Sequence, residues 1–358
     1  MFDLEESNSA KPNRKRNFLV GITSVFVVLG LVGTGGFLAF DSVSSFLSRF
    51  QVEDYTGVGG PEVTIVIEAG DDGAAVARKM VEADIIKSFD AIYRDMLRTD
   101  FVIYPGTYTF PSQIPGSKAL ELLIAGENRV TLSTTIPEGY RVTQIVEKLV
   151  ADLGLEEKDV LAAIEGSMER LPSEAINAEG YLFPATYTFD PGVTAEMAIA
   201  AMVDRTEKAL AKFDVTLKAS FDIITLAGLI QVEAGLREDF FKVSRVFLNR
   251  LDIGMLLQSD ATVSYGTGGD TVYTTDAQRA DDNPYNTYLH PGLPGGPISN
   301  PGELAIEAAL RPADGDWLYF VTIDLSTGET VFSETLAEHE AAAQLLYAWC
   351  RANEGYCD

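Results

Sequence analysis

The spacing of apolar residues is most regular in the segment from residue 222 to residue 260. Its first part, DIITLAGLIQVEAG, has apolar positions at i, i+3 and i+7, which predicts a helix with one apolar face. These positions are Ile223, Leu226 and Ile230. Glu233 continues the same face at i+10. The helix is expected to end at Ala234-Gly235, because glycine adopts the left-handed conformation that often follows a helix. Glu233 is therefore predicted to lie in the last turn.

A carboxyl group in that position is expected to have a raised pKa. Burial on an apolar face disfavours the charged form, and the negative end of the helix dipole acts in the same direction. Such a group suits a general acid that works near neutral pH. The alternative is a partly buried glutamate paired with Arg237 or Arg250, because structural ion pairs also perturb pKa values.

A second helix is predicted from Glu238 to Asp252, followed by Gly254. Near its end are Asn249 and Arg250, two polar residues beside an apolar face. The sequence LQSD follows, with Gln258 and Asp260.

The segment NPYNTYLHPGLPGGPISNPG is rich in Pro and Gly and also contains polar and aromatic residues in a row. The row is Tyr285, Asn286, Thr287 and Tyr288. Such a segment cannot form a regular helix or a central strand, and long ordered loops are usually functional. Aromatic rings beside amide and hydroxyl groups suit carbohydrate binding. The alternative is an Ω-loop that packs on itself.

The C-terminal part predicts a helix from residues 301–303, strands at WLYFVTID and TVFS, and a last helix. His290 lies in the preceding loop and could line a cleft. His339 lies in the last helix between Glu338 and Glu340, which favours a solvated face.

Residues 63–205 contain an internal repeat. Residues 67–70 correspond to 136–139, and residues 105–110 correspond to 184–189. Each copy predicts a strand, a glycine turn, two helices, a short aromatic strand and a helix. This βααβ order resembles a LysM-like module, a class that binds chitin or peptidoglycan strands. The aromatic residues of the two TYTF strands suit either core packing or sugar stacking.

The N-terminal region predicts a membrane anchor. Residues 18–40 contain no charged side chain over 23 positions, enough to span a hydrocarbon core about 30 Å thick. Lys11, Arg14, Lys15 and Arg16 precede this run, so the N-terminus is expected in the cytoplasm and the rest outside. A cleaved signal peptide is the competing interpretation. Residues 41–62 are expected to form a stalk and a flexible linker.

Composition narrows the classes of function. The 358 residues carry a net charge of −26, and no basic patch remains in the body of the chain, so nucleic-acid binding is not expected. Neither Cys350 nor Cys357 has a histidine at metal-site spacing, so no metal site is predicted. The two cysteines could form a small disulfide in an oxidising compartment or remain free thiols.

Several ordered motifs resemble one known family. LAGLIQVEAG, VSRVFLNRLDIGMLLQSDATVSYG, PYNTYLHPGLPGGPISNPGELAIEAAL and WLYFVT are similar to the YceG-like (MltG) endolytic murein transglycosylases, from about Val63 to the C-terminus. The resemblance implies a single-pass protein of the plasma (inner) membrane that cleaves nascent peptidoglycan strands between N-acetylmuramic acid and N-acetylglucosamine. The implied product is a 1,6-anhydro end, no cofactor is needed, and peptidoglycan synthases are expected partners.

The resemblance also assigns roles to residues. Glu233 matches the catalytic glutamate of the family, and Gln231 stands where many members carry a further carboxylate. The matching substrate-binding positions are Asn249, Arg250, Gln258, Asp260, Tyr285, Asn286, Thr287 and Tyr288. Arg250 is expected to position Glu233 or to contact a peptide or lactyl carboxylate. Asp260 is expected to bind hydroxyl groups or brace the loop, although it could also be a second acid.

The expected fold class is α+β, with an N-terminal transmembrane helix, LysM-like βααβ units and a mixed α/β catalytic domain. The expected divisions are a tail (1–17), a transmembrane helix (18–40), a stalk (41–62), a LysM-like domain (63–130), a second βααβ unit (131–205) and a catalytic domain (206–358). Two other functions compete with a lytic transglycosylase. One is a membrane-tethered scaffold that holds glycan without cutting it, and the other is a hydrolase that leaves a reducing end.

Overall fold

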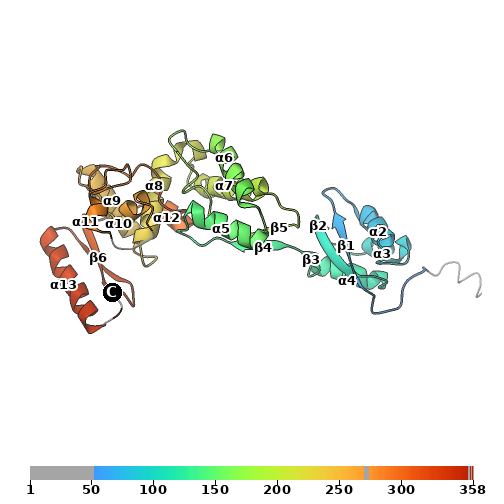
Figure 1. Cartoon of the computed structure of the whole chain (residues 1–358). Helices are drawn as coiled ribbons and strands as arrows, with labels where there is room; N and C mark the ends of the chain where they lie inside the picture. The colour runs from blue at the N-terminus through green and yellow to red at the C-terminus, as the bar shows by residue number, and fades with distance from the viewer. Residues whose placement is uncertain (1–51, 270–273, 354, 356, 358) are drawn as a thin grey trace, which may run out of the picture. The chain divides into compact units, whose positions relative to one another are not determined.

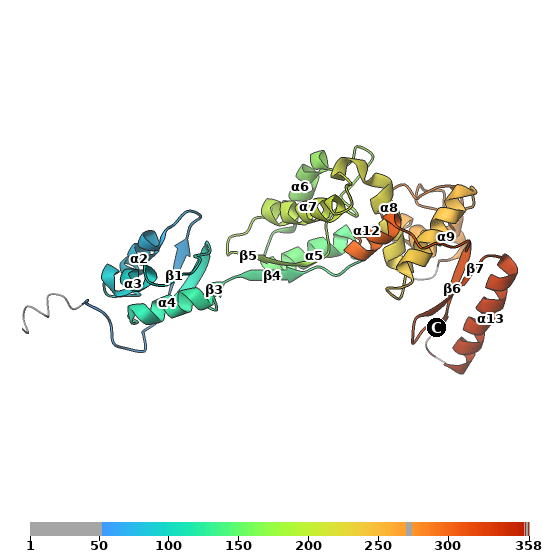
Figure 2. The same ribbon diagram turned by 180° about the vertical axis from the view of Figure 1, so that it is seen from behind.

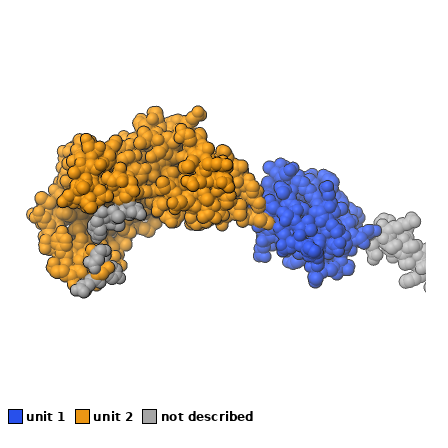
Figure 3. Space-filling view, viewed as in Figure 1, with its two compact units in different colours: residues 1–129 blue, residues 130–358 orange. Residues whose placement is uncertain are grey.

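The computed structural model describes residues 52–269, 274–353, 355 and 357. The predicted cytoplasmic tail, the transmembrane helix and the first half of the stalk lie outside these residues. Within the described ranges, no helix has both the length and the apolar character that crossing a bilayer requires. The chain divides into two compact units at Arg129 and Val130, coloured separately in Figure 3, and each is described by itself.

The first unit is a small α+β structure (Figure 1). Its elements are β1 (Glu62–Ile67), α2 (Gly73–Glu82), α3 (Phe89–Met96), β2 (Gly106–Pro111), α4 (Gly116–Ala125) and β3 (Arg129–Val130). The sheet order is β1-β2-β3, and Ile65 lies opposite Tyr108 in the antiparallel β1–β2 pair. The helices bury their apolar residues against this sheet in one core that includes Met80 and Phe110.

The second unit begins with the same order of elements. These are β4 (Leu132–Thr135), α5 (Val142–Leu153), α6 (Glu157–Ser167), β5 (Thr186–Phe189) and α7 (Ala195–Ala211). Thr134 lies opposite Tyr187 in the antiparallel β4–β5 pair.

The aromatic strands of the two copies have the same local structure. The Tyr108 hydroxyl donates to the Tyr104 carbonyl at 2.8 Å, and the Tyr187 hydroxyl donates to the Phe183 carbonyl at 2.6 Å. Both tyrosine side chains are buried, so they pack in the core and are not available for sugar stacking.

The remaining elements complete the second unit (Figures 1 and 2). They are α8 (Phe221–Glu233), α9 (Phe240–Asp252), α10 (Asp260–Gly266), α11 (Asp276–Arg279), α12 (Glu303–Leu310), β6 (Tyr319–Asp324), β7 (Glu329–Ser333) and α13 (Leu336–Ala352). Helix α8 packs against α9, α10 and α12, while α13 packs along the β6–β7 hairpin.

Helix α8 is buried on all sides, so the prediction of one apolar face is wrong. Every residue from Ile224 to Ile230 is buried, whereas Ile223 is partly exposed. The loop before α12 also covers part of the helix: Ser299 Oγ donates to the Gly228 carbonyl at 2.9 Å. The near-continuous apolar sequence of α8 is therefore explained by an interior helix.

One apolar core extends through the second unit, from Ile136 to Ala308. The boundary expected between residues 205 and 206 falls inside α7 and does not separate two cores. The residues that the structure describes are mixed α+β with three small sheets, which confirms the predicted α+β class.

Two further expectations concern the ends of the described chain. The last part of the predicted linker is held on the first unit, because Tyr55 donates to Asp84 at 2.6 Å and the Asp54 carboxylate accepts from the backbone of Gly116. At the other end, Cys350 and Cys357 form a disulfide. Of the two possibilities left open by the sequence, a disulfide and two free thiols, the structure has the disulfide.

We predict that Gly180→Ala destabilises the protein more than Gly154→Ala. Both glycines have left-handed backbones, with φ of +86° and +68°, so alanine costs about 1–2 kcal/mol at each. A Cβ at position 180 would lie 2.5 Å from Ile224 Cγ2 of α8, whereas position 154 has no neighbour within 4 Å. Overpacking adds about 1–3 kcal/mol at Gly180 alone. Urea unfolding measures the difference, and equal losses in the two variants would contradict this account of how α8 is held.

Candidate active site

A cavity of about 650 Å³ opens at the C-terminal end of α8, within the second unit. Its wall is formed by residues of α8, α9, α10, β6 and α13, together with parts of the connecting loops. Of the nine residues predicted for the site, five lie on this wall. These are Glu233, Arg250, Gln258, Asp260 and Tyr288.

Glu233 is the last residue of α8, as predicted, but the helix ends differently from the expectation. Ala234 has an extended backbone, with φ −86° and ψ 120°, and Gly235 is not among the residues with positive φ. The predicted left-handed cap is therefore wrong: the chain leaves the helix in an extended conformation. The Glu233 side chain is partly exposed and faces the cavity.

Burial raises the pKa of Glu233, and the nearby charge of Asp260 acts in the same direction. A hydrogen bond from Ser259 and the charge of Arg250 oppose these effects without reversing them. The structure records no ion pair joining Glu233 to Arg237 or Arg250. Glu233 is thus a poorly solvated acid rather than one half of a salt bridge, and it keeps its proton at higher pH than a free glutamate.

Arg250 is nearly buried and binds backbone carbonyl groups. Its Nε donates to Leu318 at 2.6 Å and its NH1 donates to Leu257 at 2.8 Å. Its guanidinium also lies over the Tyr319 ring, 5.2 Å from the centroid. The side chain therefore joins the segment before Gln258 to the start of β6, and it presents its positive charge to the cavity.

Ser259 is a site residue that the sequence reasoning did not select. Its Oγ donates to Glu233 Oε1 at 2.5 Å and accepts a hydrogen bond from the backbone of Thr262 at the start of α10. A serine immediately before a helix is a common N-cap, so the sequence carried a signal for its capping role. Its contact with Glu233 depends on the tertiary structure.

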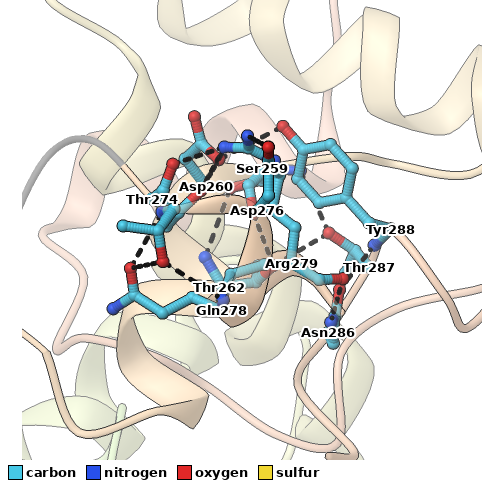
Figure 4. Close-up of polar contacts among 12 residues, drawn as sticks. Ser259, Asp260, Thr262, Thr274, Asp276, Gln278, Arg279, Asn286, Thr287 and Tyr288 are labelled. Carbon is cyan, nitrogen blue, oxygen red and sulfur yellow. Dashed lines mark hydrogen bonds and ion pairs between the residues drawn. The ribbon is translucent and has the colours of Figure 1, made fainter. Parts of the chain in front are cut away.

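The loop from Tyr285 to Tyr288 fixes the position of Ser259. The Thr287 hydroxyl accepts from the Ser259 backbone at 3.0 Å, and the Thr287 carbonyl accepts from the Gln258 backbone at 3.1 Å. The amide of Asn286 in turn donates to the carbonyl group of Arg279 (Figure 4). It also donates to the carbonyl group of Asp281.

Three of the predicted substrate-binding residues in this loop are buried behind the cavity wall. Asn286 and Thr287 are almost completely buried, and Tyr285 packs against the ring of Tyr265 with centroids 4.8 Å apart. Their contacts hold the loop together. For these three residues the structure therefore agrees with the alternative of an Ω-loop that packs on itself, and not with direct carbohydrate binding. Tyr288 is the member of the row that lies on the wall.

Asp260 is engaged by several groups. Its Oδ1 accepts hydrogen bonds from Thr274 and from the Tyr288 hydroxyl, the latter at 3.2 Å, and Arg279 NH1 lies 3.9 Å away (Figure 4). Burial and the neighbouring Asp260 raise the pKa of Tyr288 to about 12, so this hydroxyl remains a donor at neutral pH. Asp260 therefore braces the loop, one of the roles expected for it.

Gln258 and Asn249 differ in their surroundings. Gln258 is exposed on the wall and has a left-handed backbone, with φ 51°, a conformation that is costly for a residue other than glycine and is typical of functional sites. Asn249 does not lie on the wall. Its amide donates to the carbonyl groups of Gly315 and Trp317 at 3.1 and 2.9 Å, which fixes the chain before β6.

The two histidines lie in environments opposite to those expected from the sequence. His290 is exposed, lies 2.8 Å from Asp282 and is not part of the wall. His339, expected on a solvated face, lines the cavity because α13 packs over β6, and it stacks on Tyr319 with centroids 5.3 Å apart. Burial lowers the pKa of His339, and the positive charge of Arg250 acts in the same direction.

Glu179 is a second acid with a raised pKa, but it does not line the cavity. It is buried and accepts hydrogen bonds from the backbone of Val142, from Asn300 and from Tyr265. Burial raises its pKa to about 7 despite these donors. In the described part of the chain, no group of three or more His, Cys, Asp or Glu residues is arranged to hold a metal ion.

An acid with a raised pKa, facing an open cavity with polar and aromatic walls, defines a site suited to general acid–base catalysis. Residues 65–345 match the model of the YceG-like family. The chain therefore belongs to the YceG-like family, which confirms the resemblance noted in its motifs.

Individual relatives agree with this membership. An endolytic murein transglycosylase of Bacillus subtilis is 33% identical over 306 residues, with 79% of this chain and 84% of that protein covered. A protein of the same name from Streptococcus pneumoniae is 29% identical, and this chain spans 64% of its length. A crystal structure of a yceG-like protein from Listeria monocytogenes has a TM-score of 0.51 and 31% identity, covering 79% of this chain and 99% of that one.

We predict that Ser259→Ala raises the pKa of Glu233 further. The serine hydroxyl stabilises the ionised carboxylate, so its removal favours the neutral form. NMR titration of 13C-labelled glutamate side chains measures this pKa, with the signal assigned by its absence in Glu233→Gln. Ser220→Ala is the control, because the Ser220 hydroxyl precedes the same helix but donates to Leu217. A pKa that is unchanged or lower in Ser259→Ala would contradict the contact.

Proposed function

We propose that this protein is a membrane-anchored, endolytic lytic transglycosylase of peptidoglycan. It cleaves the bond between N-acetylmuramic acid and N-acetylglucosamine in nascent glycan strands and leaves a 1,6-anhydro end, which terminates strand elongation. The observation that carries the proposal is Glu233, an acid with a raised pKa at the end of α8, facing the cavity. The two relatives named endolytic murein transglycosylases support the choice of substrate.

Glu233 acts first as a general acid. In its neutral form it protonates the glycosidic oxygen while the bond to the anomeric carbon breaks through an oxocarbenium-like state. The leaving sugar departs with the proton, and Glu233 becomes a carboxylate. The Ser259 hydrogen bond and the charge of Arg250 stabilise that carboxylate. Glu233 can therefore give up its proton although its carboxylate is poorly solvated.

Glu233 then acts as a base. The carboxylate takes the proton from the C6 hydroxyl of the muramic acid, whose oxygen attacks C1 and closes the anhydro ring. Most glycosidases need a second carboxylate to activate water or to attack the sugar. Here the nucleophile belongs to the substrate, so its proximity replaces that second group. This matches the engagement of Asp260 in bracing contacts.

The saccharide is held by groups on the cavity wall. The exposed amide of Gln258 and the Tyr288 hydroxyl are suited to bind sugar hydroxyl groups. Asn249, Tyr285, Asn286 and Thr287 contribute by keeping these groups in position.

The N-terminal sequence supports a single transmembrane anchor in the plasma (inner) membrane, with the N-terminus in the cytoplasm. The Cys350–Cys357 disulfide supports an extracytoplasmic location for the C-terminal unit, because disulfides persist in oxidising compartments. The two βααβ units are proposed to be LysM-like glycan-binding modules, and peptidoglycan synthases are the proposed partners.

A membrane-tethered glycan scaffold without catalytic activity is the second candidate. It explains the anchor and the repeated βααβ units, but it gives no reason for a poorly solvated acid held at the edge of a cavity. A hydrolase is the third candidate, and it would need a second carboxylate free to activate water.

We predict that Glu233→Gln abolishes formation of anhydro-muropeptides, with a loss of at least about 1,000-fold. Glutamine keeps the shape of the side chain but cannot transfer the proton, and general acid–base catalysis alone contributes about 100- to 10,000-fold. Digestion of purified glycan strands followed by mass spectrometry measures the product. Glu340→Gln is the control, because Glu340 is exposed beside His339 on α13.

The product mass also separates the three candidates. Anhydro ends from the wild type and from Glu340→Gln, but not from Glu233→Gln, support a lytic transglycosylase. Ends heavier by one water would indicate a hydrolase, and no cleavage by the wild type would indicate a scaffold. Undiminished anhydro product from Glu233→Gln would refute the assignment of the acid.

A further inference from the structure

Arg141 brings a positive charge from the repeat region to the wall of the cavity. It immediately precedes α5, and its side chain extends to α10, where the guanidinium lies 5.1 Å from the centroid of the Tyr265 ring. One of its nitrogen atoms, NH1, donates to the Gly269 carbonyl at 2.6 Å. The side chain is partly exposed and lines the same cavity as Glu233.

Most hydrogen-bond donors of Arg141 have no recorded protein partner. A guanidinium has five N–H groups, and the described residues supply one acceptor, Gly269, for those of Arg141. Arg250, the other arginine on the wall, donates from Nε and NH1 to backbone carbonyl groups and is almost buried. The cation on the wall that is more available to a ligand is therefore Arg141.

Ser264 provides an independent sign of a ligand at the same place. It is 2% exposed and lines the cavity, yet its Oγ makes no hydrogen bond to any described residue. Buried hydroxyl groups are normally satisfied, so a buried, unpaired one on a cavity wall points to a polar ligand atom. Gly269 connects the two groups, because its carbonyl accepts from Arg141 and its N–H donates to the Ser264 carbonyl.

The two donors lie at a suitable place along α10. Ser264 is four residues beyond Asp260, which corresponds to about 6 Å along the helix. That length is comparable with the size of one sugar ring. A sugar bound with its reacting atom near Glu233 could thus direct a substituent toward Arg141 and Ser264.

We propose that Arg141 and Ser264 form a subsite for a carboxylate carried on the substituent of the muramic acid. The inference rests on the proposed action on peptidoglycan strands. A guanidinium and a hydroxyl group can each donate to one oxygen of the carboxylate, and charge-assisted hydrogen bonds of this kind are strong and directional. The subsite also offsets the unfavourable approach of an anionic substrate to a chain with a net charge of −26.

Binding of defined glycan strands to the full-length Glu233→Gln protein tests the subsite without cleavage. Isothermal titration is carried out with three soluble strands: one with peptides that have free carboxylates, one with the same peptides amidated, and one without peptides. The third strand has free lactyl carboxylates instead. Arg141→Gln and Ser264→Ala are each introduced into the Glu233→Gln protein.

Matched controls are available for both variants. Arg311 also lies over an aromatic ring, with its guanidinium 5.2 Å from the centroid of Phe213, but it belongs to neither βααβ unit and does not line the cavity. Ser244 also has a buried Oγ without a partner among the described residues and does not line the cavity. Arg311→Gln and Ser244→Ala are expected to leave the affinity of all three strands unchanged.

Arg141→Gln is expected to weaken binding of a carboxylate-bearing strand by about tenfold or more, with a smaller loss for Ser264→Ala, and to leave the amidated strand unaffected. A loss confined to the peptide strand identifies the peptide carboxylate, and a loss on the peptide-free strand identifies the lactyl group. Equal losses on amidated and free strands, no loss on either carboxylate-bearing strand, or no binding of any strand by the Glu233→Gln parent would overturn the subsite. If the carboxylate-dependent loss is found while the wild type forms no anhydro product, the subsite stands and the proposed activity fails.

Discussion

The structure of the site depends on the unfavourable solvation of one carboxyl group. Glu233 ends a helix that is buried from Ile224 to Ile230, so the backbone that carries it is fixed by the core of the second unit. The same surroundings leave the side chain poorly solvated and raise its pKa. A group held in this way can release a proton only if its carboxylate is stabilised, and Ser259 and Arg250 are placed to do so. The burial of α8 thus explains where the acid lies, why its pKa is raised, and why its carboxylate needs Ser259 and Arg250.

The surrounding residues act mainly by fixing that support. Ser259 is held by Thr287, the Thr287 loop is held by Asn286, and Arg250 joins the segment before Gln258 to β6. Each link is a buried polar group with a partner, an arrangement that is costly to break because a lost partner leaves a desolvated donor or acceptor. The left-handed backbone of Gln258 lies within this network, which can offset its strain. The main role of the polar loop is therefore to hold in position the few groups that face the cavity.

The sequence predicted the local features of the site and missed those that depend on tertiary contacts. An apolar run ending in Glu233 and glycine was enough to place an acid at a helix end, and five of the nine named residues do line the cavity. Asn249 could not be interpreted, because its partners are the carbonyl groups of residues 66 and 68 positions away. His339 was predicted to face solvent because its neighbours in sequence are acidic. In the structure α13 packs over β6, and His339 lines the cavity. The one-faced pattern predicted for α8 was wrong for the same reason, since sequence spacing does not show which elements cover a helix.

The central claim is that a neutral Glu233 donates a proton during strand cleavage, and the dependence of kcat/KM on pH tests it most directly. Activity is lost as pH rises through the pKa of an essential acid, so the account predicts that the alkaline limb of the profile lies well above the value of about 4.3 that is typical of a free glutamate. In the Ser259→Ala protein the same limb should lie at still higher pH, because the hydrogen bond that favours the carboxylate is gone. An alkaline limb near 4.3, or a limb that moves to lower pH in Ser259→Ala, would contradict the account.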